Sequence, residues 1–513
     1  MRVYIFLLCC VCLTACDSLL DVVPENALTI GNYLKDEKEL ESLTTEMHSI
    51  VKLCFTDFNA HYDMGELADK VESLNEVRNL VPSSLDENGS IYVSWKNHYD
   101  AIYLANLLLE NVENVRNVSQ ERIDFHMGQA YFVKAFLYFD LARRWGNVII
   151  TKNSYSTQAY ATSPVLEVVD TAIANAEKAF KLLPLFEDMK DISGKKMTVK
   201  QFGCKGSVAA LLAHLYAWKG SVIDLYDFTG DSKTCYEESV KWCSLLIEKK
   251  VGQYKLALTP EELCVQLSDS KGVNEESIFE FMFDRYSAEY PTNRVPAYYY
   301  VNWPVNKYSS PGEFSTDYRI SFRFYNETIR EMYDENDKRR EAFFYKFEEA
   351  SQEKSEYYTG YAYLYKWRTP VYIPDEYEPS GFVFAAFDAN YSYWRLADIY
   401  LLRAECYVKL GDIRAKADLN EIRGRAGATL YPAPDDGNLQ YAIFKEREKE
   451  LIGEGHRYYD IIRNQYFRTE LTPAFTNLSD KDVKDGALYI PIGSDAQVLN
   501  DVIRQNRYWA KFF

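Results

Sequence analysis

Three helical patterns follow one another between Tyr391 and Arg463, and they constrain the fold more than any other part of the chain. From Trp394 to Leu410, apolar residues cover almost the whole circumference of the predicted helix, so it is buried on most sides. Gly411 is placed to close this helix in the left-handed conformation, and Asp412 to open the next one as its N-cap. The next helix is apolar on one face only, at Ala415, Leu419, Ile422 and Ala426. A helix pair of this kind cannot cover its own apolar face and therefore predicts neighbours of the same kind.

Further helical patterns extend this prediction over most of the chain. They cover residues 36–55, 92–115, 120–145, 164–183, 199–219 and 234–249. Three helices share one spacing, in which a small residue is followed three positions on by tyrosine and four positions further by another small residue: Ala135, Tyr138 and Ala142; Ala213, Tyr216 and Gly220; Ala404, Tyr407 and Gly411. Small residues at this spacing let helices approach closely. The predicted fold is mostly α, a tetratricopeptide-like superhelix of helix pairs at about residues 36–280 and 391–465.

Residues 286–393 differ from the helical parts because they are rich in tyrosine and proline. A large share of the chain's 42 tyrosines falls there, and prolines such as Pro291, Pro304 and Pro370 interrupt any long helix. We therefore expect an irregular, loop-rich subdomain at about residues 281–390, with short strands at 277–283 and 361–367. Residues 466–513 form a closing segment, in which 469–485 is predicted as polar loop. The body of the protein then spans residues 36–513.

The first fifteen residues have the pattern of a secretory signal peptide. Arg2 is followed by an apolar run from Val3 to Leu13 and then by Thr14, Ala15 and Cys16. This ending resembles a bacterial lipoprotein box, so we expect residues 1–15 to be removed, Cys16 to be acylated and residues 16–35 to form a tether. Each buried methylene contributes about 0.8 kcal/mol, so several acyl chains would hold the protein on a membrane. An ordinary signal peptide with an incidental cysteine is the alternative.

Charge and metal-ligand patterns exclude several classes of partner. The formal net charge of -18 argues against nucleic acid, which is bound through Lys and Arg. The histidines include no pair at helical ligand spacing, so we predict no metal site and no cofactor. Buried free thiols are favoured over disulfides for six cysteines that lie largely in apolar helical patterns: Cys54, Cys204, Cys235, Cys243, Cys264 and Cys406.

The chain resembles the SusD/RagB-family outer-membrane lipoproteins of Bacteroidetes. The resemblance is carried near the C-terminus by Glu446, Arg447, Glu450, Leu451, Glu454, Gly455, Arg457, Asp460 and Arg463, and in the N-terminal half by Trp95, Tyr99, Ile102, Asn106, Ala130, Ala135, Tyr138 and Gly146. It implies about four helix pairs, a place at the cell surface on the outer membrane, and no enzymatic activity. It also implies a SusC-like TonB-dependent transporter as partner, to which such proteins deliver captured glycan or, in some members, peptide.

Two groups of residues are candidates for ligand binding. Flat aromatic rings suit the C–H faces of sugars, and such rings cluster at Tyr286, Tyr290, Tyr298, Tyr299, Tyr300 and Trp303. The second group follows the first helix, where the resemblance places part of the ligand site, and comprises Tyr62, Asp63, Glu66 and Arg78. A structural role stays open for both groups, as core packing for the rings and as ordinary loop side chains for the polar residues.

The signature near the C-terminus also invites a catalytic interpretation. Its charged residues include Arg447, Glu450, Glu454, Arg457 and Asp460. Carboxylates interleaved with arginines favour ionised, paired states, whereas a general acid needs a raised pKa, so we interpret them as a structural ion-pair network. A lipid-anchored polysaccharide hydrolase is an alternative, but no pattern places two carboxylates around a scissile bond. A helical scaffold that binds only proteins is a third possibility.

Overall fold

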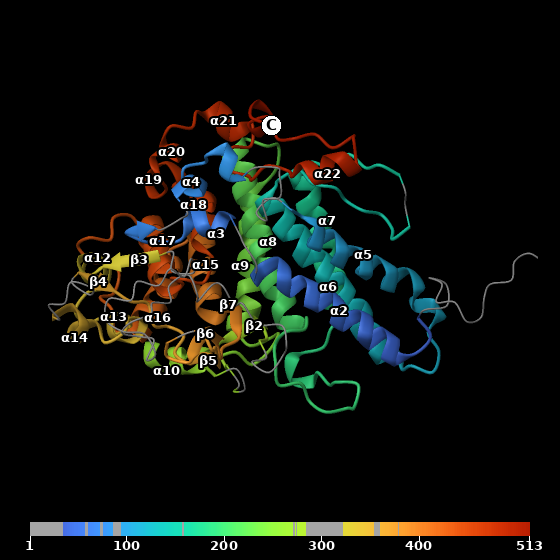
Figure 1. Ribbon diagram of the computed structural model, residues 1–513, viewed down its shortest axis with the longest axis horizontal. Helices are drawn as coiled ribbons and strands as arrows, with labels where there is room; N and C mark the ends of the chain where they lie inside the picture. The colour runs from blue at the N-terminus through green and yellow to red at the C-terminus, as the bar shows by residue number, and fades with distance from the viewer. Residues whose placement is uncertain are drawn as a thin grey trace, which may run out of the picture.

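The structure is a computed structural model and is mostly helical (Figure 1). It describes residues 34–56, 60–71, 75–85, 94–155, 158–269, 272, 274–283, 322–352, 360–377 and 379–513. The longest helices run through the centre of the molecule, and the short elements between residues 322 and 362 gather at one end (Figure 1).

Four helix pairs form the array that the sequence predicts. They are α2 (Glu37–Thr56) with α5 (Lys96–Asn111), α6 (Gln120–Arg144) with α7 (Val165–Leu182), α8 (Lys205–Tyr226) with α9 (Ser232–Ile247), and α15 (Leu396–Lys409) with α16 (Ala415–Ala426). Helix α5 also packs on α6, α7 on α8, and α9 on α15, so each pair covers the apolar face of the next. The predicted fold class is confirmed.

The repeated spacing of small residues lies at these helix contacts. Ala135, Ala213 and Ala404 are fully buried. At Gly220 an added Cβ would lie 2.8 Å from the ring of Tyr236, so glycine lets α8 approach α9 closely.

Helix ends follow local capping more than the apolar pattern. Gly411 has a φ of 71° after α15, as predicted. Asp412 does not cap α16, which begins only at Ala415; its carboxylate instead accepts the N–H of Arg414 at 2.9 Å. Helix α8 starts at Lys205 and not near residue 199, because Cys204 is its N-cap in a capping box.

Short strands form three small antiparallel sheets in the described part of the chain. β2 (Ser277–Phe281) pairs with β7 (Tyr391–Arg395), and β5 (Pro370–Pro374) pairs with β6 (Phe382–Phe387). The third sheet has the order β1 (Lys70–Val71), β3 (Phe322–Tyr325), β4 (Tyr361–Ala362). The strand predicted at 277–283 is therefore present, whereas Trp394 and Arg395 end a strand and do not begin the predicted helix.

The remaining elements are short and cover the ends of the array. They are α3 (Ala60–Gly65), α4 (Asn75–Arg78), η2 (Pro82–Leu85), η3 (Val112–Asn114), η4 (Phe186–Asp188), α10 (Pro260–Leu267), α12 (Asn326–Met332), α13 (Arg339–Phe343), α14 (Phe347–Gln352), α17 (Leu439–Glu450), α18 (Arg457–Arg463), α19 (Phe467–Glu470), α20 (Pro473–Thr476), α21 (Asp480–Lys484), α22 (Ser494–Leu499) and η5 (Trp509–Lys511). The polar loop predicted at 469–485 is wrong, because α20, α21 and the end of α19 occupy that segment.

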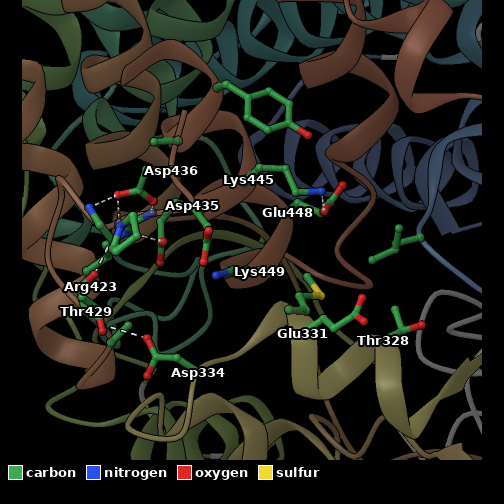
Figure 2. Close-up of a pocket in the computed structure, with 18 residues that line it drawn as sticks. Thr328, Glu331, Asp334, Arg423, Thr429, Asp435, Asp436, Lys445, Glu448 and Lys449 are labelled. Atoms are coloured by element: carbon green, nitrogen blue, oxygen red, sulfur yellow. Dashed lines mark hydrogen bonds and ion pairs between the residues drawn. The ribbon is translucent and has the colours of Figure 1, made fainter. Parts of the chain in front are cut away.

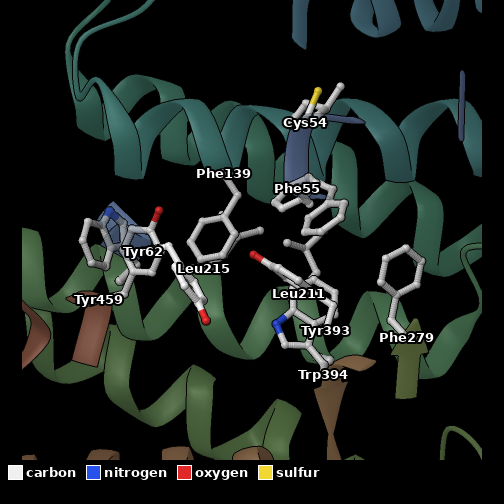
Figure 3. Packing of buried hydrophobic residues seen from close by; sticks show 14 of the residues in the cluster. Cys54, Phe55, Tyr62, Phe139, Leu211, Leu215, Phe279, Tyr393, Trp394 and Tyr459 are labelled. Carbon is white, nitrogen blue, oxygen red and sulfur yellow. The ribbon is translucent and has the colours of Figure 1, made fainter. Parts of the chain in front are cut away.

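Aromatic side chains fill the core where α2, α6 and α8 meet the β2–β7 sheet (Figure 3). Phe55 stacks on Phe136 with 4.3 Å between ring centroids. Phe279 of β2 lies 5.9 Å from Trp394 of β7 by the same measure. The predicted buried free thiols are confirmed for the six cysteines from Cys54 to Cys406.

Candidate functional site

The first candidate group flanks β1 of the β1–β3–β4 sheet, because Tyr62, Asp63 and Glu66 precede β1 and Arg78 follows it. Lys70 of β1 lies opposite Arg323 of β3, and Val71 lies opposite Phe322. The second candidate group precedes β3 in the sequence; Tyr286, Tyr290, Tyr298, Tyr299, Tyr300 and Trp303 lie outside the described residues, as does Cys16. The sheet thus places β1 beside the start of β3.

The described members of the first group are mostly interior residues. Tyr62, Asp63 and Glu66 are at most 5% exposed. The carboxylate of Glu66 accepts the backbone N–H groups of Gly453 and Gly455 at 3.3 and 3.0 Å. Tyr62 donates its hydroxyl to the carbonyl of Gly453 at 3.4 Å. These bonds join residues 62–66 to Gly453 and Gly455 in the C-terminal signature. Contact of the first group with a ligand stays a prediction.

Arg78 stabilises the same turn from the other side. Its guanidinium donates to the backbone carbonyls of Asp63 and Glu66 at 3.3 and 3.1 Å. It also lies over the ring of Phe322, 5.8 Å from the ring centroid. Arg78 therefore links residues 63–66 to β3, the strand that contains Phe322.

The charged signature residues form a buried ion-pair network that contacts the turn at residues 63–66. Glu450 accepts from Arg395 at 2.7 Å and from Arg339 at 3.1 Å, and Glu454 accepts from Arg395 at 2.9 Å. Burial alone would raise the pKa of both glutamates, but the surrounding arginines outweigh it and hold each pKa below its usual value. Both carboxylates are therefore ionised and structural.

The rest of the signature continues the network into α18. Arg447 pairs with Asp398 at 2.7 Å and with Asp460 at 2.9 Å, and Arg457 pairs with Glu448 at 2.6 Å. Arg457 also donates to the backbone carbonyl of Gly65 at 2.7 Å. The network thus fixes the loop of residues 451–456, whose glycines bind Glu66.

Two tyrosines on the surface of the β1–β3–β4 sheet form an aromatic pair that the sequence did not single out. Tyr325 of β3 lies directly opposite Tyr361 of β4. Their ring centroids are 5.5 Å apart at an interplanar angle of 27°, and Tyr325 is 43% exposed. The guanidinium of Arg323 lies 5.7 Å from the Tyr361 ring centroid. Only the pairing of two strands far apart in sequence brings these rings together.

A cavity of about 530 Å³ lies between α12, α16 and α17 (Figure 2). Asp69 connects this cavity to the tyrosine pair, because its carboxylate accepts the N–H of Tyr325 at 2.6 Å and the hydroxyl of Thr328 at 2.8 Å. The wall carries many polar side chains: Thr328, Glu331, Asp334, Arg423, Thr429, Asp435, Asp436, Lys445, Glu448 and Lys449.

Several carboxylates of the cavity are held in the ionised state. Burial alone would raise the pKa of Asp334, but backbone N–H groups such as that of Thr429 outweigh it and lower the pKa. Asp436 pairs with Arg423 at 2.6 Å, and its pKa is also lowered despite burial. Such groups accept hydrogen bonds well but cannot act as a general acid, which needs a raised pKa.

Lys449 supplies a donor to the same cavity. Its ammonium points into the open space in Figure 2. Burial lowers the pKa of Lys449, and within the described part of the chain no carboxylate lies within ion-pair distance of it. A cavity with ionised acceptors and an available donor suits a ligand that carries many hydroxyl groups.

The described residues hold no group of three or more His, Cys, Asp or Glu side chains placed to bind a metal ion. Of the helices in the described ranges, none has both the length and the apolar character needed to cross a bilayer.

Comparison with known proteins gives consistent matches along the chain. A family profile described as the SusD family matches residues 275–509, and one described as "Starch-binding associating with outer membrane" matches residues 19–216. SusD-like protein P38 of Formosa agariphila is 23% identical over 477 residues, which is 88% of each chain. A SusD homologue from Bacteroides thetaiotaomicron superimposes with a TM-score of 0.72 at 21% identity, over 93% of this chain and 99% of that one. A protein described as a laminarin-binding SusD-like protein has a TM-score of 0.66 at 20% identity, over 92% and 99% of the two chains.

Proposed function

Because the chain belongs to the SusD/RagB family, we propose that it is a lipid-anchored protein of the outer-membrane surface that captures an oligosaccharide and delivers it to a SusC-like TonB-dependent transporter. It binds the glycan and does not cleave it. The starch-binding description of the N-terminal profile and the laminarin-binding neighbour both support a glycan as ligand.

The stacked pair of Tyr325 and Tyr361 is the observation that carries the proposal. Tyr325 is held in place by its stacking on Tyr361 and stays 43% exposed, so it offers a flat apolar ring at little entropic cost, and the C–H face of a sugar fits such a ring. The neighbouring cavity supplies carboxylate acceptors and the Lys449 donor for sugar hydroxyls. The lowered pKa values of Asp334 and Asp436 favour binding over acid catalysis there.

Calorimetric titration of the soluble body tests this site. Laminari- and malto-oligosaccharides are titrated into the native protein and into Tyr325→Ala and Tyr361→Ala. Loss of one ring of the pair is expected to weaken binding about tenfold. Tyr377→Ala is the matched control, since Tyr377 is a tyrosine of the same region that is 89% exposed. Equal affinities for all four proteins would overturn the proposed site.

The same protein can be used to test two alternative functions, peptide binding and polysaccharide hydrolysis. A peptide library that yields binders where the oligosaccharides yield none would identify a peptide-binding, RagB-like member. New reducing ends on incubation with polysaccharide would identify a hydrolase. Binding of an oligosaccharide without turnover is the expected result.

The aromatic residues from Tyr286 to Trp303 remain part of this proposal. They precede β3, which carries Tyr325, so the chain leads from them into the proposed site. Alanine at these positions is expected to weaken binding and nutrient uptake. Unchanged uptake would favour the scaffold that binds only proteins. Tyr62, Asp63, Glu66 and Arg78 are proposed to support the site through the turn that they hold.

The anchor is tested on whole cells. Radiolabelled palmitate is expected to enter the native protein and to be absent from Cys16→Ser, which should no longer remain with the outer-membrane fraction. Co-purification with a SusC-like transporter from detergent extracts is the matching test of delivery.

A further inference from the structure

A second cavity, of about 620 Å³, lies where the end of α8 meets the C-terminal segment. Its wall combines the end of α8 and the residues that follow it, the end of α21 and the residues that follow it, residues 504–507 near the C-terminus, and Asn147 with residues 162–166 around the start of α7. In Figure 1, α21 and the C-terminus lie beside one end of α8, well away from α12 and α16, which border the first cavity. The second cavity is therefore a separate feature of the surface.

Three aromatic rings stand in a row along this cavity. Phe228 stacks on Tyr226 with 5.5 Å between centroids at 28°, and Tyr226 stacks on Tyr489 with 5.9 Å at 18°. Phe228 is 40% exposed, whereas the two tyrosines are 8% exposed, so the outermost ring keeps an open surface. Asp227 ends α8 with a φ of 53° and thereby turns the chain so that Phe228 lies beside Tyr226.

The charges at the cavity do not cancel. Lys484 is paired with Asp227 at 2.7 Å, and Asp485 is paired with Lys481. One guanidinium nitrogen of Arg504 donates hydrogen bonds to the backbone carbonyls of Asp501 and Ile503, at 2.6 and 3.0 Å.

Two exposed arginines, Arg504 and Arg507, remain after this pairing. Among the residues for which side chains are described, no carboxylate forms an ion pair with either of them. Two uncompensated guanidinium groups therefore border the rings, on a protein whose formal net charge is -18.

We propose that this cavity binds an acidic sugar residue, with the sugar ring on Phe228 and its carboxylate or sulfate on Arg504 and Arg507. Guanidinium groups bind oxyanions through charge-assisted, often bidentate hydrogen bonds. A flat ring beside them supplies the apolar contact that a sugar face needs and a simple anion does not. The strongly negative whole protein repels polyanions at long range, so local arginines are required to hold one.

The test uses two matched probes in calorimetric titration of the full soluble body. Tetragalacturonate carries a carboxylate on every residue, and its fully methyl-esterified form has the same backbone without the charge. A sulfated disaccharide forms a third arm that distinguishes sulfate from carboxylate recognition, and inorganic sulfate is the control for an anion without a sugar ring. The variants are Arg504→Gln with Arg507→Gln, and Phe228→Ala. Tyr377→Ala is the control variant, because Tyr377 is exposed and lines neither cavity.

The native protein is expected to bind tetragalacturonate or the sulfated disaccharide about tenfold more tightly than the methyl ester, and added salt should remove the difference. The double arginine variant should lose that preference, Phe228→Ala should weaken all sugar probes, and Tyr377→Ala should change neither result. The proposal is overturned if no acidic sugar binds, if inorganic sulfate binds as tightly as the sugars, or if the arginine variant keeps the native preference. Loss of neutral glycan binding in Tyr325→Ala alone would concern only the first site.

Discussion

Glu450 shows what the ion-pair network requires of a single residue. Its carboxylate accepts from Arg395 at 2.7 Å and Arg339 at 3.1 Å and also pairs with Arg425, all of them buried. Glu450→Gln keeps the shape but removes the charge, which leaves buried guanidinium groups short of a counter-ion. We expect a loss of about 3–5 kcal/mol in the free energy of unfolding, because breaking a buried pair costs that much.

Urea unfolding monitored by circular dichroism measures this loss. The control is Asp412→Asn, since Asp412 pairs with Arg414 on the surface and its loss should leave the urea midpoint nearly unchanged. A midpoint for Glu450→Gln equal to that of the control would contradict the structural role of the network.

The sequence predicted one side of this network and missed the other. Glu450 and Glu454 stand in a run of alternating acids and arginines, which is visible as a local pattern. Their partners Arg395 and Lys366 come from elements more than fifty residues away, and Lys366 follows a tyrosine-rich stretch with no charge pattern. Local spacing reveals which residues are charged but does not reveal which distant charges meet.

At the scale of elements, the packing of α3 on α18 depends on one glycine. A Cβ added at Gly65 would lie 2.4 Å from Cβ and 2.7 Å from the backbone nitrogen of Tyr458. Because backbone atoms cannot move aside as a flexible side chain can, Gly65→Ala should force the two helices apart. We expect a loss of about 1–3 kcal/mol, the usual range for overpacking.

Thermal unfolding of Gly65→Ala and Gly424→Ala checks this prediction. Gly424 lies within α16 and has open space where a Cβ would be added. Alanine there should be neutral or stabilise the helix by about 0.5–1 kcal/mol. A lower melting temperature for Gly424→Ala than for Gly65→Ala would show that the contact does not limit the packing.

Elements with a strong apolar period were predictable, and elements formed by distant pairing were not. The long helices follow patterns of the helical period, which depends only on neighbouring residues. Residues 391–395 are buried on both faces of a short strand, so their continuous apolar run resembles the start of the buried helix behind them. The contact between the rings of Tyr325 and Tyr361 exists only because β3 pairs with β4, 36 residues further along the chain.

At the scale of the whole molecule, buried histidines couple stability to pH. Burial lowers the pKa of His48 to about 4, of His61 to about 3 and of His456 to about 4, from the usual histidine value of 6.5. The folded protein therefore keeps these rings neutral at a pH where the unfolded chain protonates them. Stability from this source is fully present above pH 6.5 and is lost as the pH falls toward the folded pKa values.

The paired carboxylates extend the same effect to lower pH. Burial alone would raise the pKa of Glu405, but Arg463 outweighs it and lowers the pKa to about 2 from 4.5. Its contribution is present above pH 4.5 and is lost as the pH falls toward 2. As the pH falls, the free energy of unfolding is therefore lowered first by protonation of the histidines and then by protonation of the paired carboxylates.

We expect the free energy of unfolding to fall continuously from about pH 6.5 downward, by about 1.4 kcal/mol per pH unit for each buried histidine. Urea titrations at intervals between about pH 8 and 4 measure this slope, and His48→Gln is the variant that isolates one ring. His48 bonds Gln129 at 3.0 Å, and a neutral amide can keep that bond without titrating. The variant should therefore show a shallower slope than the native protein between pH 6.5 and 4. Equal slopes for the two proteins would mean that His48 is protonated in the folded state, which its full burial opposes because a buried imidazolium lacks the solvation of water.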